Sequence, residues 1–259
     1  MSEVLSQSQI DMLLNAARMG EMDTSSEEKK PEEKKYPKYD FYSPKKFTRD
    51  RLKMINSIFE SYVRVISSRL NAMLHMLCEL EIDSVEEQRY FEFSKALSER
   101  DVLTLVTNTM QTVPDKDAIL FHITTGIMIS MFDRMLGGTG DVDGEINSDY
   151  KYTDLELRLY NDFVKDLVEG MSSAWKNYID IGFGFNRVEV NPTLVQLIGL
   201  DETVVIVGIT IKTPVSSGRF SICLPGNLLS DVFAQLNRET ASMQQTNPKD
   251  SEEIMDYLK

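Results

Sequence analysis

Three glycines within four residues, Gly137, Gly138 and Gly140, form the stretch of the sequence best suited to phosphate chemistry. A glycine-rich loop can turn its backbone amides toward an anion. A P-loop, however, needs Gly-Lys-Ser or Gly-Lys-Thr at the start of a helix. Here Gly-Gly-Thr-Gly follows a helical pattern and leads into the acidic stretch 141–145, which repels phosphate. The loop is therefore not a nucleotide site, and Gly137 is also explained simply as the left-handed residue that ends a helix.

Metal ligands and nucleophiles are sparse. The chain has two cysteines, Cys78 and Cys223, and two histidines, His75 and His122, with neither a Cys-x-x-Cys nor a His-x-x-x-His spacing. Both cysteines lie in apolar stretches far apart, which indicates reduced thiols in a core. We predict no metal and no cofactor.

The N-terminal stretch 5–17 reads as a helix that needs a surface to dock on. Ser6 and Gln9 form a capping box, and an apolar stripe follows at Ile10, Leu13, Leu14 and Ala17. About three turns of helix are marginal in water. Two hypotheses stay open: packing on the chain's own body, or binding of a partner.

The next stretch, residues 19–43, is rich in Lys, Glu and Pro and offers little to bury, which is typical of a flexible tether. Between Lys29 and Lys53, ten basic residues face four acidic ones, so this window carries about +6 and the rest about −19. The window could bind a membrane surface or an acidic partner, but its interleaved Glu and Pro favour a solvated linker. The acidic body argues against nucleic acid as a partner.

The N-terminal residues resemble the signature with which the FliM family of flagellar motor switch proteins binds phosphorylated CheY, the chemotaxis response regulator. The match consists of Leu5-Ser6-Gln7, Ile10-Asp11 and Leu13-Leu14-Asn15, directly before a charged tether. The resemblance implies that CheY is bound by Leu5, Ser6, Gln7, Gln9, Ile10, Asp11, Leu13, Leu14 and Asn15.

The glycine loop is similar to the Gly-Gly-x-Gly loop through which the same family grips FliG, the rotor component that meets the stator. The resemblance implies FliG contacts at Phe132, Asp133, Arg134, Gly137, Gly138, Thr139 and Gly140. Glycines let a partner approach the backbone closely. Phe132, Met135 and Leu136 could add apolar area beside them.

The body reads as two related halves. Helical spacing predicts long helices over 46–78, with or without a break at Ser67-Ser68, and over 154–175, which Thr153 caps. The halves align at an offset of 105 in these helices and of 100 after them, where Gly126 meets Gly226. The remaining predicted elements are strands at 80–85, 90–93, 102–108 and 118–123 before a helix at 126–136, and strands at 182–190, 204–212 and 218–224 before a helix at 227–236.

Two halves that share one sheet, with helices outside, give a three-layer α/β/α fold with pseudo-twofold symmetry. This layout resembles the middle domain common to FliM and the CheC and CheX phosphatases. It implies an enzyme as the alternative function, a phosphatase acting on CheY. Such enzymes carry Glu-x-x-Asn, which occurs nowhere in this chain; Met54 and Ser57, then Leu159 and Asp162, stand at about those positions. We therefore predict no enzyme.

The chain is expected to divide into a CheY-binding helix (1–18), a linker (19–43), a CheC-like domain (44–238) and a polar tail or hinge (239–259). The FliN-like C-terminal domain that follows in the family is missing, so FliN is a partner only where that domain is present. By resemblance, neighbouring FliM copies are further partners in a ring on the cytoplasmic face of the inner membrane, at the flagellar basal body. No apolar run is long enough to span a membrane. A structural adaptor unrelated to motility is the third hypothesis.

Overall fold

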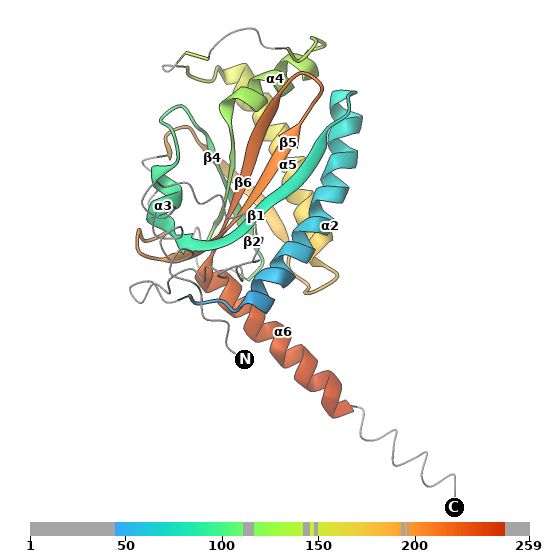
Figure 1. The fold of residues 1–259 in the computed structure, drawn as a ribbon, viewed down its shortest axis with the longest axis vertical. Helices are drawn as coiled ribbons and strands as arrows, with labels where there is room; N and C mark the ends of the chain where they lie inside the picture. The colour runs from blue at the N-terminus through green and yellow to red at the C-terminus, as the bar shows by residue number, and fades with distance from the viewer. Residues whose placement is uncertain are drawn as a thin grey trace, which may run out of the picture. The chain divides into compact units, whose positions relative to one another are not determined.

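Segments with strand and helix patterns alternate along the body, and they fold into one antiparallel sheet with helices on both faces (Figure 1). The structure is a computed structural model and describes residues 45–110, 117–141, 146–147, 150–192, 195 and 197–246, with the backbone alone for 239–246. The predicted N-terminal helix, the linker and residues 247–259 lie outside the described residues.

The elements follow one another as the two-half pattern predicts. In chain order they are α2 (Arg49–Leu74), β1 (Glu79–Arg89), α3 (Tyr90–Lys95), β2 (Leu103–Asn108), β3 (Ile119–Ile123), α4 (Thr125–Met135), α5 (Asp154–Trp175), β4 (Phe183–Glu189), β5 (Thr203–Lys212), β6 (Ser217–Pro225) and α6 (Gly226–Thr246). Helix α2 runs without a break through Ser67-Ser68. Thr153 caps α5 in a reciprocal capping box with Glu156, which confirms the predicted helix start.

The order of the strands confirms the predicted duplication. Among the described residues the sheet has six strands in the order β1-β5-β6-β3-β2-β4. Exchanging β1 with β4, β2 with β5 and β3 with β6 gives the same order read backwards. Each edge strand also has a register shift against its neighbour, between Ile82 and Ser84 for β1 and between Leu105 and Val106 for the β2–β4 pair. The sheet therefore has a pseudo-twofold axis between β3 and β6.

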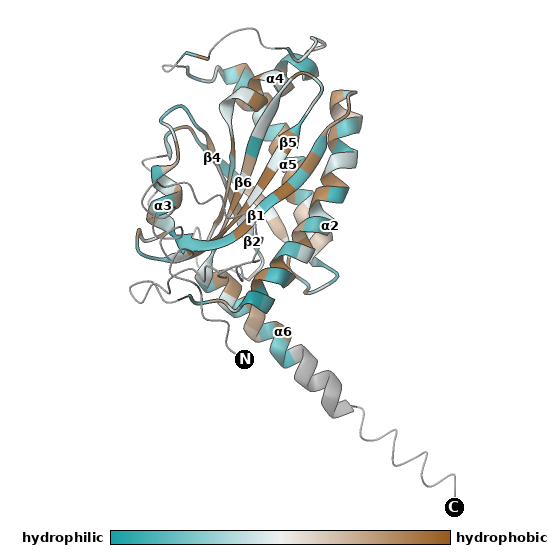
Figure 2. Cartoon of the chain, in the orientation of Figure 1, coloured by the Kyte–Doolittle hydropathy of each residue, from teal (hydrophilic) through white to brown (hydrophobic). Residues whose placement is uncertain are grey.

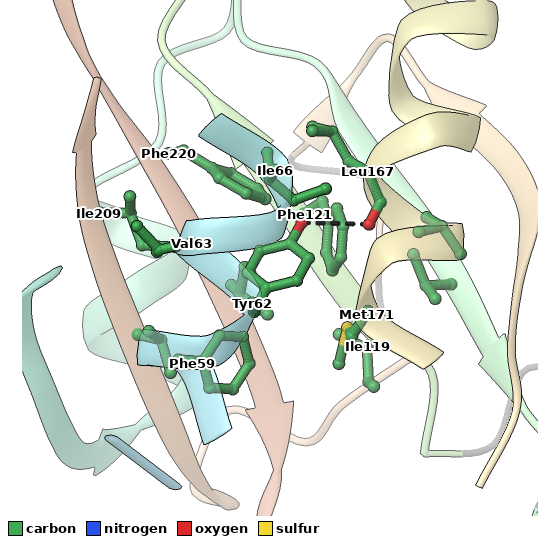
Figure 3. Packing of buried hydrophobic residues seen from close by; sticks show 14 of the residues in the cluster. Phe59, Tyr62, Val63, Ile66, Ile119, Phe121, Leu167, Met171, Ile209 and Phe220 are labelled. Atoms are coloured by element: carbon green, nitrogen blue, oxygen red, sulfur yellow. Dashed lines mark hydrogen bonds between the residues drawn. The ribbon is translucent and has the colours of Figure 1, made fainter. Parts of the chain in front are cut away.

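One core lies between this sheet and helices α2, α4, α5 and α6. The hydropathy colouring shows hydrophobic residues along the strands that these helices cover (Figure 2). The offset of 105 holds in the core, because seven of the eight buried residues of α2 have a buried counterpart in α5, and the eighth, Leu74, matches the buried Ile179 just after α5. The pairs are Ile55 and Tyr160, Ile58 and Phe163, Phe59 and Val164, Tyr62 and Leu167, Val63 and Val168, Ile66 and Met171, and Leu70 and Trp175. Tyr62 donates a hydrogen bond from its hydroxyl to the carbonyl of its own counterpart, Leu167, at 3.2 Å (Figure 3).

The second predicted offset was wrong by one residue. The buried residues of α4 and α6 match at 101, which pairs Ile127 with Leu228, Met128 with Leu229, Met131 with Val232 and Phe132 with Phe233. At an offset of 100, Leu120 would be equivalent to Phe220, although the two side chains belong to different cores on opposite faces of the sheet. Glycine and serine coincidences produced the wrong alignment, whereas the faces of strands and helices define the correct one.

The opposite face of the sheet carries the third layer, and here a predicted strand is wrong. Tyr90–Phe93 begins helix α3. Tyr90 and Phe93, three residues apart, are both buried in a second core against Leu105 and Cys223. Four residues are too few for periodicity to separate a strand from a helical turn. Strand β1, predicted as 80–85, extends to Arg89 instead.

Helix α6 is longer than predicted. It continues to Thr246, ten residues beyond Leu236, where the predicted helix ended. The added stretch contains good helix formers and no Gly or Pro before Pro248. A polar sequence therefore ended the predicted helix too early, because loss of the apolar pattern marks the edge of the core and not the end of a helix.

Candidate functional site

The glycine loop is the end of helix α4. The helix ends at Met135 with Leu136 as its C-cap, and Gly137 adopts the left-handed conformation with φ +94°, as predicted. The amide of Gly138 donates to the carbonyl of Asp133 at 2.8 Å, and that of Gly137 to Arg134 at 3.1 Å. These two bonds form a Schellman motif, which satisfies carbonyls at the helix end.

The Asp133 side chain stabilises the loop through a hydrogen bond to its backbone. Its Oδ2 accepts the amide of Gly140 at 2.8 Å. A Cβ on Gly138 would lie 2.1 Å from the same oxygen, so only glycine leaves room for this carboxylate. The Ser130 hydroxyl bonds the carbonyl of Gly140, which is itself left-handed at φ +80°. Gly138 and Gly140 are thus required by close approach and by conformation.

Arg134 ties the loop to another helix end. Its Nε and Nη2 donate to the carbonyls of Leu74 and His75 at 2.9 and 3.0 Å, and its Nη1 donates to the carbonyl of Gly138 at 2.9 Å. His75 is the left-handed residue that ends α2. A cation at carbonyls that a helix end leaves unpaired is favourable. One guanidinium therefore fixes the ends of α2 and α4 relative to each other.

The predicted contact residues divide into those that support the loop and those that face solvent. Phe132 is buried and packs edge-on against Tyr152, at 6.0 Å between ring centroids. Asp133 and Arg134 turn inward, and Gly140 is buried. Gly137 and Thr139 are exposed, Gly138 partly so, and Leu136 is 63% exposed beside them.

Two apolar residues extend the exposed surface, and both were missed in the sequence. Leu77, just after α2, is 60% exposed, and Val215, in the β5–β6 turn, is 41% exposed. Val215 lies within 3.3 Å of where a Cβ on Gly140 would stand, and Arg134 connects the end of α2 to the loop. Neither has a local signal in the sequence, because only the fold brings these segments to the loop. We call Leu77, Leu136–Thr139 and Val215 the loop surface.

The start of α4 is also anchored. The hydroxyl of Thr125 donates to Oδ1 of Asp101 at 3.2 Å, and the Ser98 amide donates to Oδ2 at 2.8 Å. Nε2 of His122 lies 3.1 Å from Oδ2. Burial raises the pKa of Asp101, but His122, Ser98 and Thr125 together outweigh it and hold that pKa below its usual value. The helix that presents the loop is thus held at both ends.

The positions expected for phosphatase residues lack the required groups. Met54 and Ser57 lie on α2, and Leu159 and Asp162 on α5. Asp162 is exposed and pairs with Lys165 at 3.3 Å. Neither position carries a carboxamide that could orient a water molecule.

Cys78 and Cys223 are both buried free thiols, as predicted, and burial raises the pKa of each. The part of the chain that the structure describes holds no group of three or more His, Cys, Asp or Glu able to bind a metal ion. Within that same part, every helix is too short or too polar to cross a bilayer. The predicted CheY-binding residues Leu5 to Asn15 lie outside the described residues.

Known proteins are similar to this sequence over most of its length. The family described as flagellar motor switch protein FliM matches residues 48–241. The FliM protein of Bacillus subtilis (strain 168) is 28% identical over 235 residues, covering 91% of this chain and 69% of that protein. The FliM protein of Thermotoga maritima is 26% identical over 259 residues, covering 100% of this chain and 76% of that protein.

Solved structures share the fold. The FliM middle domain of H. pylori superposes with a TM-score of 0.63 at 20% identity, covering 73% of this chain and 99% of that one. The chain from the FliG–FliM complex of the same organism gives 0.63 at 22%, covering 69% and 94%. The sheet and helices described above are those of this domain.

Proposed function

The chain belongs to the FliM family of flagellar motor switch proteins, and on this basis we propose that it couples phosphorylated CheY, through FliG, to the direction of flagellar rotation. The body carries the FliG contact and the N-terminal segment carries the CheY contact.

The observation that carries the FliG contact is the construction of the loop. Asp133 and Arg134, both half-buried, hydrogen-bond the loop backbone with their side chains, and residues 136, 137 and 139 stay exposed. A preformed loop loses little conformational entropy when it binds. Leu77, Leu136 and Val215 supply apolar area around the exposed glycine backbone. The H. pylori chain from a FliG–FliM complex, which shares the fold, supports FliG as the partner.

For CheY we propose the stretch 5–15, on the residues that resemble the family signature. Burial of Ile10, Leu13 and Leu14 contributes about 5–8 kcal/mol gross. Ordering about a dozen residues costs a similar amount. Net binding is therefore weak, in the micromolar range. Such a contact releases its signal quickly, which suits a switch.

We further propose that copies of the chain pack side by side in a ring at the cytoplasmic face of the inner membrane, in the flagellar basal body. The long helices α2 and α5, capped by Thr48 and Thr153, lie in pseudo-equivalent positions. This arrangement suits head-to-tail contacts between copies that close into a ring. FliN would join only through a C-terminal domain beyond this chain. No catalytic role is proposed.

Replacing Gly138 with valine tests the FliG contact. A Cβ would collide with the Asp133 carboxylate, displace it from Gly140 and change the loop shape. We expect FliG binding, measured by calorimetry on the purified chain, to weaken at least about tenfold, which corresponds to about 1.4 kcal/mol. Gly126→Ala is the matched control, because a Cβ there meets only Ile146, at 3.6 Å. Equal FliG affinity of the two variants would contradict the proposal.

A further inference from the structure

A hollow of about 430 Å³ lies on the face of the sheet away from α2 and α5, beside helix α3. It is separate from the loop surface and plays no part in the proposed function. Strands β1, β3, β5 and β6 form its floor, and α3 forms one wall. Its size is that of a small-molecule site. Both polar and apolar side chains line it.

Arg219 provides a cation on this floor. Its Nη2 lies 2.4 Å from the position that a Cβ on Gly208 would take, so the guanidinium rests over a strand residue that has no side chain. The guanidinium makes one long contact, 3.5 Å, with the Ser84 hydroxyl. Among the described residues no carboxylate lies within 4.0 Å of it. Arg219 is exposed, so the fold places a hydrated cation here without a carboxylate partner among the described residues.

His122 provides a buried polar group at the inner end. Its side chain is 10% exposed and lines the hollow. Nε2 faces Oδ2 of Asp101 at 3.1 Å, so this ring nitrogen already has the Asp101 carboxylate as its partner. Ser221 stands directly opposite His122 on β6 and also lines the hollow.

Glu86 provides the opposite charge. It follows Ser84 by two residues on β1, so it lies on the same face about 7 Å further along the strand. No cation lies within 4.0 Å of it in the described part of the chain. Phe93, Leu97 and Ile206 form an apolar wall. The hollow is thus lined by one cation, Arg219, by two carboxylates, Glu86 and Glu92, and by an apolar wall.

We propose that this hollow binds a small zwitterion, an α-amino acid with an apolar side chain. The carboxylate pairs with Arg219 and accepts from the Ser84 and Ser221 hydroxyls. The ammonium group pairs with Glu86, and the side chain packs on Phe93 and Leu97. A simple anion is disfavoured, because Glu86 and Glu92 both line the hollow and would repel it.

Three matched probes test the charge pattern by calorimetry or ligand-observed NMR on the full chain. They are L-phenylalanine, 3-phenylpropanoate, which lacks the ammonium group, and 2-phenylethylamine, which lacks the carboxylate. We expect each incomplete probe to bind at least about tenfold more weakly than L-phenylalanine, because each loses a charge-assisted contact. Equal binding of all three probes, or saturable binding of none, would overturn the proposal.

Matched variants test the residues. Arg219→Met should weaken L-phenylalanine at least about tenfold and remove its advantage over 2-phenylethylamine. Glu86→Gln should remove its advantage over 3-phenylpropanoate. Gly208→Ala keeps both charged residues but moves the Arg219 guanidinium, because the added Cβ would collide with it. This variant should therefore also weaken binding of L-phenylalanine. Arg64→Met, at an exposed arginine on α2, should change nothing. If Arg219→Met and Arg64→Met bind L-phenylalanine alike, the site is not the one proposed.

Discussion

Arg134 connects three backbone carbonyls that come from two different helix ends. Its guanidinium satisfies Leu74 and His75 at the end of α2 and Gly138 in the loop. Arg134→Met removes these bonds and leaves the carbonyls partly buried, so the free energy of unfolding should fall by about 2 kcal/mol. Urea denaturation measures this loss.

Arg134→Lys should recover little of that loss, because a single ammonium group cannot reproduce the forked donors of the guanidinium, which reach both helix ends. Arg158→Met, at an exposed arginine on α5, is the control and should stay close to the parent stability. Full stability in the lysine variant would show that charge alone matters at this position.

Asp101 should make stability depend on acid pH. Its pKa is lowered in the folded protein, since His122, Ser98 and Thr125 outweigh the effect of burial. Its contribution is therefore complete above the ordinary carboxyl pKa of about 3.9 and is lost as pH falls below that value. Urea midpoints at a series of pH values check this.

Asp101→Asn should be less stable at neutral pH and should lose less stability below about pH 4, because the group that takes up the proton is gone. Asp180→Asn, at an exposed aspartate, serves as the control. If the urea midpoint falls equally steeply below about pH 4 in Asp101→Asn and in the parent, the Asp101 carboxylate is not the cause of the acid dependence.

At the scale of elements, Gly170 sets how closely α5 approaches α2. A Cβ at Gly170 would lie 2.4 Å from Cδ1 of Ile66, a fully buried side chain. Alanine improves helix propensity by about 1 kcal/mol. We nevertheless expect Gly170→Ala to destabilise the protein by about 1–3 kcal/mol, because the helices must move apart. Thermal unfolding measures the sign.

The matched partner variant is Ile66→Val, which removes the colliding methyl group. It should cost about 1 kcal/mol alone but should relieve most of the effect when combined with Gly170→Ala. Simple additivity of the two changes would mean that the two side chains do not meet at this crossing.

The sequence predicted long elements better than short ones, for a physical reason. Helices α2 and α5 expose a repeating apolar stripe over many turns, so their positions and the offset of 105 could be read directly. Tyr90–Phe93 offers a single turn, and the polar end of α6 offers no stripe at all. In both places contacts with the rest of the fold, or local propensity, decided the structure, and periodicity carried no information.

The candidate site was predicted in position but not in the roles of its residues. The Gly-Gly-Thr-Gly pattern located the loop and the left-handed Gly137. It could not show that Arg134 turns toward the end of α2, because two of its three partners, Leu74 and His75, lie about 60 residues earlier in the chain. For the same reason Leu77 and Val215 went unnoticed. Long-range contacts are set by topology.

At the scale of the whole molecule, the described residues from Lys45 onward contain an extensive core of their own, and the proposed CheY-binding stretch 5–15 lies far from them in the sequence. We therefore expect FliG binding and CheY binding to be separable. A chain that begins at Lys45 should unfold at the temperature of the full chain and keep its FliG affinity. It should lose binding to phosphorylated CheY, because stretch 5–15 is gone. Calorimetric titration of both chains with both partners checks this.

A peptide of residues 1–17 completes the comparison. It should bind phosphorylated CheY at micromolar affinity and unphosphorylated CheY much more weakly. The Ile10→Ala peptide, which loses one apolar contact of the stripe, should bind about tenfold more weakly again. Equal affinity for both forms of CheY would leave the N-terminal helix without a signalling role. If the chain that begins at Lys45 still binds phosphorylated CheY with the affinity of the full chain, the CheY-binding site lies on the body instead.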